Sequence, residues 1–257
     1  MDNSIQIALV QTPLLWEDPA GNRKVLERKI AEVAQQVDLF VLPEMFTTGF
    51  TMHPKNLDAK EGVITVAWMQ GLAKKHLAAI TGSIVFFENG KWFNRLFFVY
   101  PDGNYITYDK KHTFTLAGED KVYTAGQERV LIPYKGFSIC PLICYDLRFP
   151  VWARNTDNYD ILLYVANWPK PRIKAWDALL KARAIENMSY VVGVNRIGDD
   201  AEGHEYPGHS AVYDVYGHSM VHSVAEEVLV VRLEKGALEA ARRKLRFLED
   251  RDSFTFT

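Results

Sequence analysis

The chain has 257 residues, of which 48% are hydrophobic, 12% aromatic and 24% charged. This is the composition of a globular protein whose core is large enough to fold without disulfides or bound metal ions. The 30 Lys and Arg residues against 32 Asp and Glu residues leave a formal net charge of -2. This near-balance argues against nucleic acid or an anionic membrane surface as the main partner.

Strand and helix patterns alternate along the chain. We predict strands over residues 5–10, 38–42, 78–87, 92–100, 105–108, 161–165, 191–195, 211–215 and 228–233, with two more inside 130–143 broken near Lys135-Gly136. Apolar residues at helical spacing predict helices over 22–35, 63–76 and 173–186. This interleaving indicates an α/β fold with a mixed sheet. No linker rich in Pro, Ser or Gly divides the chain, so we expect one domain over 1–257.

Two segments echo each other. Residues 37–44 (VDLFVLPE) resemble residues 159–167 (YDILLYVAN). Each reads as a buried strand with polar residues at its C-terminal end, where open α/β sheets carry functional groups. The echo indicates two pseudo-equivalent halves.

The cellular location follows from the cysteines and the apolar segments. Two cysteines, Cys140 and Cys144, are too few for a disulfide framework. Residues 1–12 lack the basic and long apolar regions of a secretory signal, and the longest apolar runs are too short to cross a bilayer. We therefore expect a cytoplasmic protein that does not bind membranes.

Cys144 is a candidate nucleophile, because it ends an apolar run and is followed by Tyr145 and Asp146. A thiol at such a strand-to-helix turn, with Asp146 capping a short helix, would face the positive helix end, which lowers the pKa of the thiol. The alternative is a buried small apolar residue, and this is our interpretation of Cys140 in the middle of the run. No further Cys or His pair completes a metal site with the two cysteines.

Three other residues are candidates for the chemistry. Glu44 follows Pro43 at the end of an apolar strand, where a partly desolvated carboxylate suits acid–base catalysis, although a solvated loop residue is the alternative. Lys110 is the last residue of a predicted strand, where a lysine usually protects the sheet edge from pairing with another chain. If it lay beside a thiol, it would instead stabilise a thiolate and an oxyanion. His112 is a possible base, but no papain-like signature supports that role.

These motifs together resemble a known family. Leu42-Pro43-Glu44, the 108–112 segment (YDKKH) and the 144–150 segment (CYDLRFP) are similar, in order, to the three signatures of the nitrilase superfamily of carbon–nitrogen hydrolases. Secondary matches to the same superfamily are Asn94, Glu119, Gly126 and residues 166–169 and 183–187. The likeness covers about 5–233, which leaves a C-terminal helix and tail over 234–257. Residues 44–50 and 165–169 look like the bacterial omega-amidase branch, which hydrolyses 2-oxoglutaramate and 2-oxosuccinamate.

The resemblance implies a four-layer α-β-β-α sandwich with two six-stranded sheets. It also implies a catalytic triad of Glu44, Lys110 and Cys144, and a role for Glu119 in positioning the lysine or assisting the leaving group. Lys110 and the backbone N–H of Tyr145 would hold the oxyanion of a thioester-forming reaction. No cofactor or metal is required, the substrate is a small-molecule amide, and a homodimer is expected in which the C-terminal tail packs across the interface.

A keto-acid omega-amide carries a carboxylate that needs a cationic partner when enclosed. Arg172, in a loop stiffened by two prolines, is the first candidate, and Arg148, which could instead pair with Asp146, is the second. Phe46, Phe50 and Trp168 are expected to form apolar walls.

Two alternatives stay open. The first is a related enzyme acting on another small amide, nitrile or carbamoyl compound, and the second is a non-catalytic protein, which would need a missing triad member. We further expect Asn94 and Asn187 to satisfy buried backbone groups, and Arg183 and Glu186 to form an ion pair.

Overall fold

The computed structural model describes residues 4–255 and is built around two six-stranded sheets. The first has the order β14 (Glu227–Glu234), β1 (Ser4–Gln11), β2 (Leu39–Val41), β3 (Ala79–Glu88), β4 (Lys91–Val99), β5 (Tyr105–Asp109). The second has the order β13 (Ser219–Ser223), β12 (Ser210–Tyr213), β9 (Tyr190–Asn195), β8 (Ile161–Ala166), β7 (Phe137–Ile143), β6 (Ile132–Tyr134). A separate two-stranded hairpin joins β10 (Ile197–Asp199) and β11 (Glu205–Pro207).

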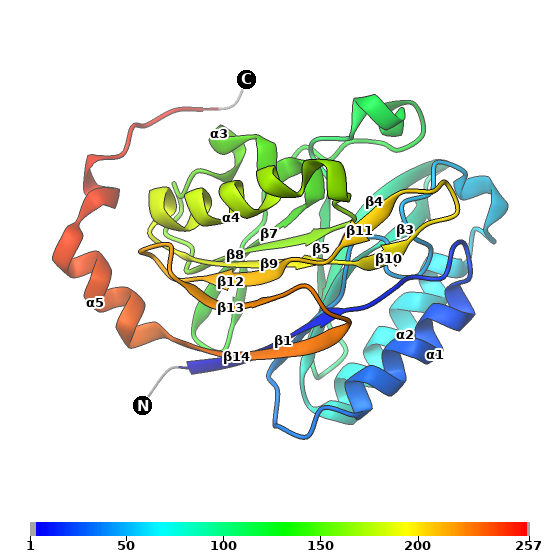
Figure 1. The fold of residues 1–257 in the computed structure, drawn as a ribbon, viewed down its shortest axis with the longest axis horizontal. Coiled ribbons are helices and arrows are strands. Elements are labelled where there is room, and N and C mark those ends of the chain that lie inside the picture. Colours follow the sequence, from blue (N-terminus) through cyan, green and yellow to red (C-terminus); the bar gives the residue numbers. More distant parts are fainter. Residues whose placement is uncertain (1–3, 256–257) are drawn as a thin grey trace.

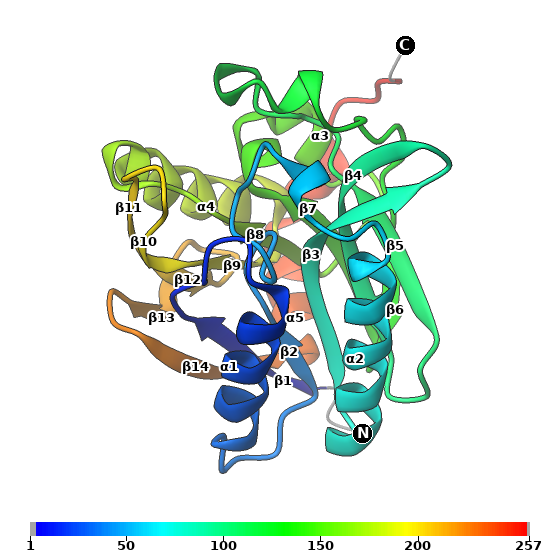
Figure 2. The same cartoon turned by 90° about the vertical axis from the view of Figure 1, so that its right-hand side faces the viewer.

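Helices cover the outer faces of both sheets (Figures 1 and 2). Helices α1 (Pro19–Ala31) and α2 (Glu61–His76) lie against the first sheet, and α3 (Pro150–Ala153) and α4 (Ile173–Asn187) against the second. Helix α5 (Lys235–Leu245) follows β14 and leads into the C-terminal tail. The α/β sandwich expected from the sequence is confirmed. Among residues 4–255, no helix is both long enough and apolar enough to span a membrane.

The core explains why several strands are continuously apolar. One buried cluster contains side chains of both sheets, such as Leu9 and Val41 from the first and Leu142 and Leu163 from the second. A second cluster lies between the first sheet and helices α1 and α2. A strand covered on both faces needs apolar residues at every position, and β8 is buried throughout.

The two sheets repeat one pattern of strand directions. In the first sheet β2 runs parallel to β1 and β3, with antiparallel strands outside them. In the second, β8 runs parallel to β7 and β9, again with antiparallel strands outside them. Strands β2 and β8, which carry the sequence echo, therefore occupy equivalent positions in the two halves.

Some boundaries differ from the expected ones. Helix α1 spans residues 19–31 and not 22–35, because Asp18 caps it by accepting a 2.9 Å hydrogen bond from Gly21 N and Pro19 occupies its first turn. The turn at Lys135-Gly136 is confirmed, and both residues have positive φ. Strands β10, β11 and β13 and helix α3 were not predicted, since they are short or largely exposed.

Candidate active site

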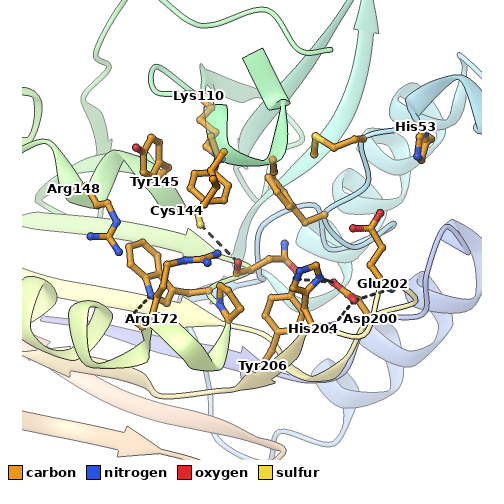
Figure 3. Close-up of a pocket in the computed structure, with 18 residues that line it drawn as sticks. His53, Lys110, Cys144, Tyr145, Arg148, Arg172, Asp200, Glu202, His204 and Tyr206 are labelled. Carbon is orange, nitrogen blue, oxygen red and sulfur yellow. Dashed lines mark hydrogen bonds and ion pairs between the residues drawn. The ribbon is translucent and has the colours of Figure 1, made fainter. Parts of the chain in front are cut away.

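Cys144 lies at a sharp turn where the second sheet gives way to a short helix. Strand β7 ends at Ile143, and a 3-10 helix covers Cys144–Arg148. Cys144 has a φ of 44°, an unusual backbone conformation for a residue other than glycine. Its sulfur lies 3.9 Å from the carbonyl oxygen of Asn167 and faces the pocket (Figure 3). The turn thus presents a half-buried thiol beside the first helical N–H groups, including that of Tyr145.

Asp146 holds this turn in place. Its buried carboxylate accepts hydrogen bonds from Ile143 N at 3.0 Å, from His112 N at 2.9 Å and from the Tyr108 hydroxyl at 2.8 Å. His112 Nδ1 lies 2.7 Å from the same carboxylate, and its ring stacks on Phe149. The structure therefore places His112 behind the turn, outside the residues that line the pocket.

Behind the thiol lies a buried cluster of two carboxylates and one ammonium group. Lys110 Nζ is 2.8 Å from Glu44 Oε1 and 2.8 Å from Glu119 Oε2, and all three side chains are at most 1% exposed. Asn94 Nδ2 donates to Glu44 Oε1 at 2.8 Å and to Glu119 Oε1 at 3.1 Å. Asn94 therefore binds the carboxylates and not buried backbone groups, so our expectation for it was wrong.

The charges of this cluster shift several pKa values. Burial alone would lower the pKa of Lys110, but Glu119 and Glu44 outweigh it and raise the pKa above its ordinary value. Burial raises the pKa of Glu119, although Lys110 partly offsets this. The two acidic groups beside Lys110 thus favour its charged form.

The pKa of Cys144 is raised and not lowered as we expected. Burial is the largest cause, and the charge and hydrogen bonding of Glu44 raise the pKa further, while Lys110 opposes them. The expectation was wrong because the following helix is a single 3-10 segment of five residues, whose dipole is small, and the buried cluster behind the sulfur carries more acid than base. This raised pKa favours the neutral thiol form of Cys144.

Cys144 lines a cavity of about 430 Å³. Of the expected site residues, Lys110, Cys144, Tyr145, Arg148, Trp168, Arg172 and Phe50 line it. Glu44 and Glu119 lie beneath it, behind Lys110. Phe46 does not line it: its fully buried ring packs on Trp68 in the core under α2, so its expected role as a wall was wrong.

Two arginines lie on one side of the cavity (Figure 3). The guanidinium carbon of Arg172 lies 5.1 Å from the Phe114 ring centre, and that of Arg148 lies 5.0 Å from the Trp168 ring centre. Within residues 4–255 neither arginine forms an ion pair with a carboxylate. Arg148 therefore does not pair with Asp146. Arg172 is half-buried and Arg148 is exposed, so Arg172 is the better shielded cation.

The residues on the opposite side of the cavity were not predicted from the sequence. Asp200, Glu202, His204 and Tyr206, from the β10–β11 hairpin, line it. Asp200 organises this hairpin by accepting bonds from the backbone N–H of Glu202 and His204 and from the Tyr206 hydroxyl. Burial alone would raise the pKa of Asp200, but these hydrogen bonds lower it. The segment has no apolar periodicity that could have marked it.

The expected ion pair behind the site is present. Arg183 on α4 forms an ion pair with Glu186 at 2.8 Å. It also donates a 2.7 Å hydrogen bond to the carbonyl of Leu147, in the 3-10 helix that begins at Cys144. Asn187 accepts a 2.9 Å bond from Asn155 N, as expected of a residue that satisfies a buried backbone group.

The fold and this arrangement define a hydrolase acting on carbon–nitrogen bonds. The chain belongs to the carbon–nitrogen hydrolase family, whose pattern it matches over residues 6–243. It is 41% identical over 98% of both chains to an omega-amidase of Yersinia enterocolitica, and 34% identical to a 2-oxoglutaramate amidase of Bacillus subtilis over 91% of this chain and 92% of that one.

A solved structure shares the whole fold. A carbon–nitrogen hydrolase superfamily protein of Xanthomonas campestris, with an arsenic adduct in its active site, superposes with a TM-score of 0.95, at 40% identity over 99% of both chains.

Proposed function

We propose that this protein is an omega-amidase that hydrolyses the terminal amide of 2-oxoglutaramate or 2-oxosuccinamate and releases ammonia. The proposal rests mainly on the cavity, where a thiol backed by a buried Glu–Lys–Glu cluster faces the half-buried Arg172. Within residues 4–255 no carboxylate forms an ion pair with this arginine. Relatives that span nearly the full chain bear the names omega-amidase and 2-oxoglutaramate amidase.

In the proposed mechanism Glu44 is the general base. It takes the proton of the Cys144 thiol as the sulfur attacks the amide carbonyl, and Lys110 and the backbone N–H of Tyr145 stabilise the oxyanion. Because the resting thiol is neutral, proton removal accompanies attack, which requires a carboxylate beside the sulfur. One oxyanion donor typically contributes about 3 kcal/mol, and positioned proton transfer roughly 10²–10⁴-fold in rate.

Glu44 then returns the proton to the departing nitrogen, and ammonia leaves a thioester on Cys144. A water molecule deprotonated by Glu44 hydrolyses this thioester, which restores the thiol and releases the keto dicarboxylic acid. Glu119 accepts a hydrogen bond from Phe114 N at 2.5 Å as well as from Lys110. We assign Glu119 the role of fixing the ammonium group of Lys110 toward the oxyanion, so that Lys110 needs no rearrangement during the reaction.

The substrate carboxylate would bind at Arg172. A guanidinium pairs with a carboxylate through two parallel hydrogen bonds, and the aromatic face of Phe114 keeps its plane fixed. Phe50 and Trp168 line the apolar part of the cavity. A small keto acid with one terminal carboxylate fits this distribution of charge.

The test is ammonia release from a panel of 2-oxoglutaramate, 2-oxosuccinamate, glutamine, a short neutral amide and a short nitrile. The proposal predicts that kcat/KM for the two keto-acid amides exceeds that for every other compound. A higher kcat/KM for the neutral amide or the nitrile would instead support the wider amidase or nitrilase alternative.

We also propose a homodimer in the cytoplasm. Exposed apolar side chains on the outer helical layer and the tail, Val151, Ile185 and Phe247, are at least 45% exposed and would be covered by a second copy. Both cysteines are free thiols, as in a reducing compartment. Light scattering tests the dimer: Ile185→Asp should give a monomer if this surface is the interface, and an unchanged mass would rule it out.

A further inference from the structure

A cluster of metal-binding side chains lies outside the active-site cavity. Asp177 is on α4, His209 lies in the loop between β11 and β12, and His222 is on the edge strand β13. One ligand atom from each lies within 4.8 Å of the other two, and none of the three residues lines the cavity. We propose that Asp177, His209 and His222 bind one divalent transition-metal ion of the zinc type.

The spacing of the ligand atoms is close to that of a coordinated ion. His209 Nδ1 lies 3.0 Å and 3.1 Å from the two carboxylate oxygens of Asp177. Bonds of about 2.0–2.2 Å at a tetrahedral angle place neighbouring ligand atoms about 3.3–3.6 Å apart. The rings of His209 and His222 are 5.0 Å apart and nearly perpendicular. Small side-chain rotations therefore suffice to bring all three groups onto one ion.

The backbone holds His209 in position before any ion binds. His209 has a φ of 63°, which is uncommon for a residue other than glycine. Its carbonyl accepts a 2.8 Å bond from Trp176 Nε1, and its N–H donates a 2.9 Å bond to the carbonyl of Ser223. His222 lies next to Ser223 on β13 and opposite Ala211 on β12. The two imidazoles therefore belong to neighbouring segments that are joined by backbone hydrogen bonds.

The chemical types of the three ligand atoms indicate which metal ions the site would bind. Two imidazole nitrogens and one carboxylate oxygen suit zinc, cobalt or nickel, whereas calcium and magnesium prefer sites made only of oxygen ligands. A four-coordinate ion would keep one water molecule. His222 is exposed and Asp177 half-buried, so the ion enters directly from solvent.

Binding would join α4 to the edge of the second sheet. Asp177 follows Trp176, whose ring packs at 5.5 Å against Trp168 in the cavity wall. An ion between Asp177 and the two histidines therefore supports the helix that lies behind this wall. We assign the ion a stabilising role, and the amide hydrolysis proposed above does not depend on it.

The test is calorimetric titration of the chelator-treated, tag-free Cys144→Ala protein with zinc chloride, because the active-site thiol would itself bind zinc. We expect one zinc ion per chain and a melting temperature raised by roughly 5–10 °C at about 100 times the dissociation constant. Asp177→Asn and His222→Ala should each weaken binding by at least about tenfold. His222 is exposed, so its replacement does not endanger folding.

The matched control is His218→Ala. His218 Nδ1 lies 3.1 Å from Asp214 Oδ2 in the segment between β12 and β13, but the pair belongs to no three-ligand cluster among the described residues. Zinc affinity in this variant should be unchanged. Absence of saturable zinc binding in the Cys144→Ala protein would overturn the proposal, and so would an equal loss of affinity in His218→Ala and His222→Ala.

Discussion

The backbone N–H of Asn167 donates a 2.8 Å hydrogen bond to Glu44 Oε2, and Asn167 Nδ2 donates a 2.6 Å bond to the backbone carbonyl of Glu44. The two residues are 123 positions apart and follow β8 and β2, the equivalent central strands of the two sheets. The proposed base is thus oriented by the opposite half of the molecule. The candidate active site lies where the two equivalent strand ends meet.

The two cysteines should respond differently to substitution. Cys144→Ala should abolish hydrolysis and leave the fold intact, because its sulfur faces the cavity. Cys140→Ala should keep most activity, since Cys140 is fully buried within β7. Ammonia release and circular dichroism check both variants. An acyl adduct on Cys140 in a mass spectrum would contradict the assignment of the nucleophile.

Lys110 and His112 should also be distinguishable. Lys110→Met should reduce kcat by about 10²–10³-fold, because it removes the cation at the oxyanion. Its effect on folding should be modest, since the buried Glu119, whose pKa burial raises, takes up a proton when the cation is absent. His112→Asn should be much milder, because His112 supports the turn through Asp146. If His112→Asn were as inactive as Cys144→Ala, Glu44 would not be the base.

The raised pKa of Cys144 predicts the ionisation of the resting enzyme. The pKa lies above the ordinary value of 9.0, so the thiol is protonated below that pH and ionises only well above it. Ultraviolet thiolate absorbance, taken as the difference between the native protein and Cys144→Ala, should therefore be absent at neutral pH. A thiolate signal at pH 7 would contradict the general-base mechanism.

Glu44→Gln should separate ionisation from activity. Removing the carboxylate charge lowers the pKa of Cys144, because Glu44 raises it by charge and hydrogen bonding. The same absorbance difference should thus appear at lower pH, yet hydrolysis should fall by at least about 10²-fold without a base. A variant with more thiolate and unchanged activity would show that the thiolate alone suffices.

Arg172→Met tests recognition of the substrate. Loss of a buried charge partner costs about 2–5 kcal/mol, so kcat/KM for keto-acid amides should fall roughly 30-fold or more. A short neutral amide should be nearly unaffected. Equal losses on both substrates would assign Arg172 to loop structure, and no loss on either would show that it does not bind the substrate carboxylate.

Many strands and several candidate site residues could be predicted from the sequence, because they depend on local patterns. Buried strands such as β7 and β8 are continuous apolar runs, and Glu44 and Cys144 follow such runs directly. The hydrogen bond from Asn94 to Glu44 could not be predicted, since the two residues are 50 positions apart in the sequence. The raised pKa of Cys144 was missed for the same reason: its burial, which is the largest cause, and the carboxylates that raise it further depend on distant segments.

In the proposed mechanism, catalysis passes through a thioester on Cys144. The most direct measurement is mass spectrometry of the native enzyme quenched with acid during turnover of 2-oxoglutaramate, followed by peptide mapping. The thioester mechanism predicts an added acyl group, with loss of the amide nitrogen, on the peptide containing Cys144, and none in Cys144→Ala. Full turnover with no covalent adduct, or an adduct on any other residue, would contradict it.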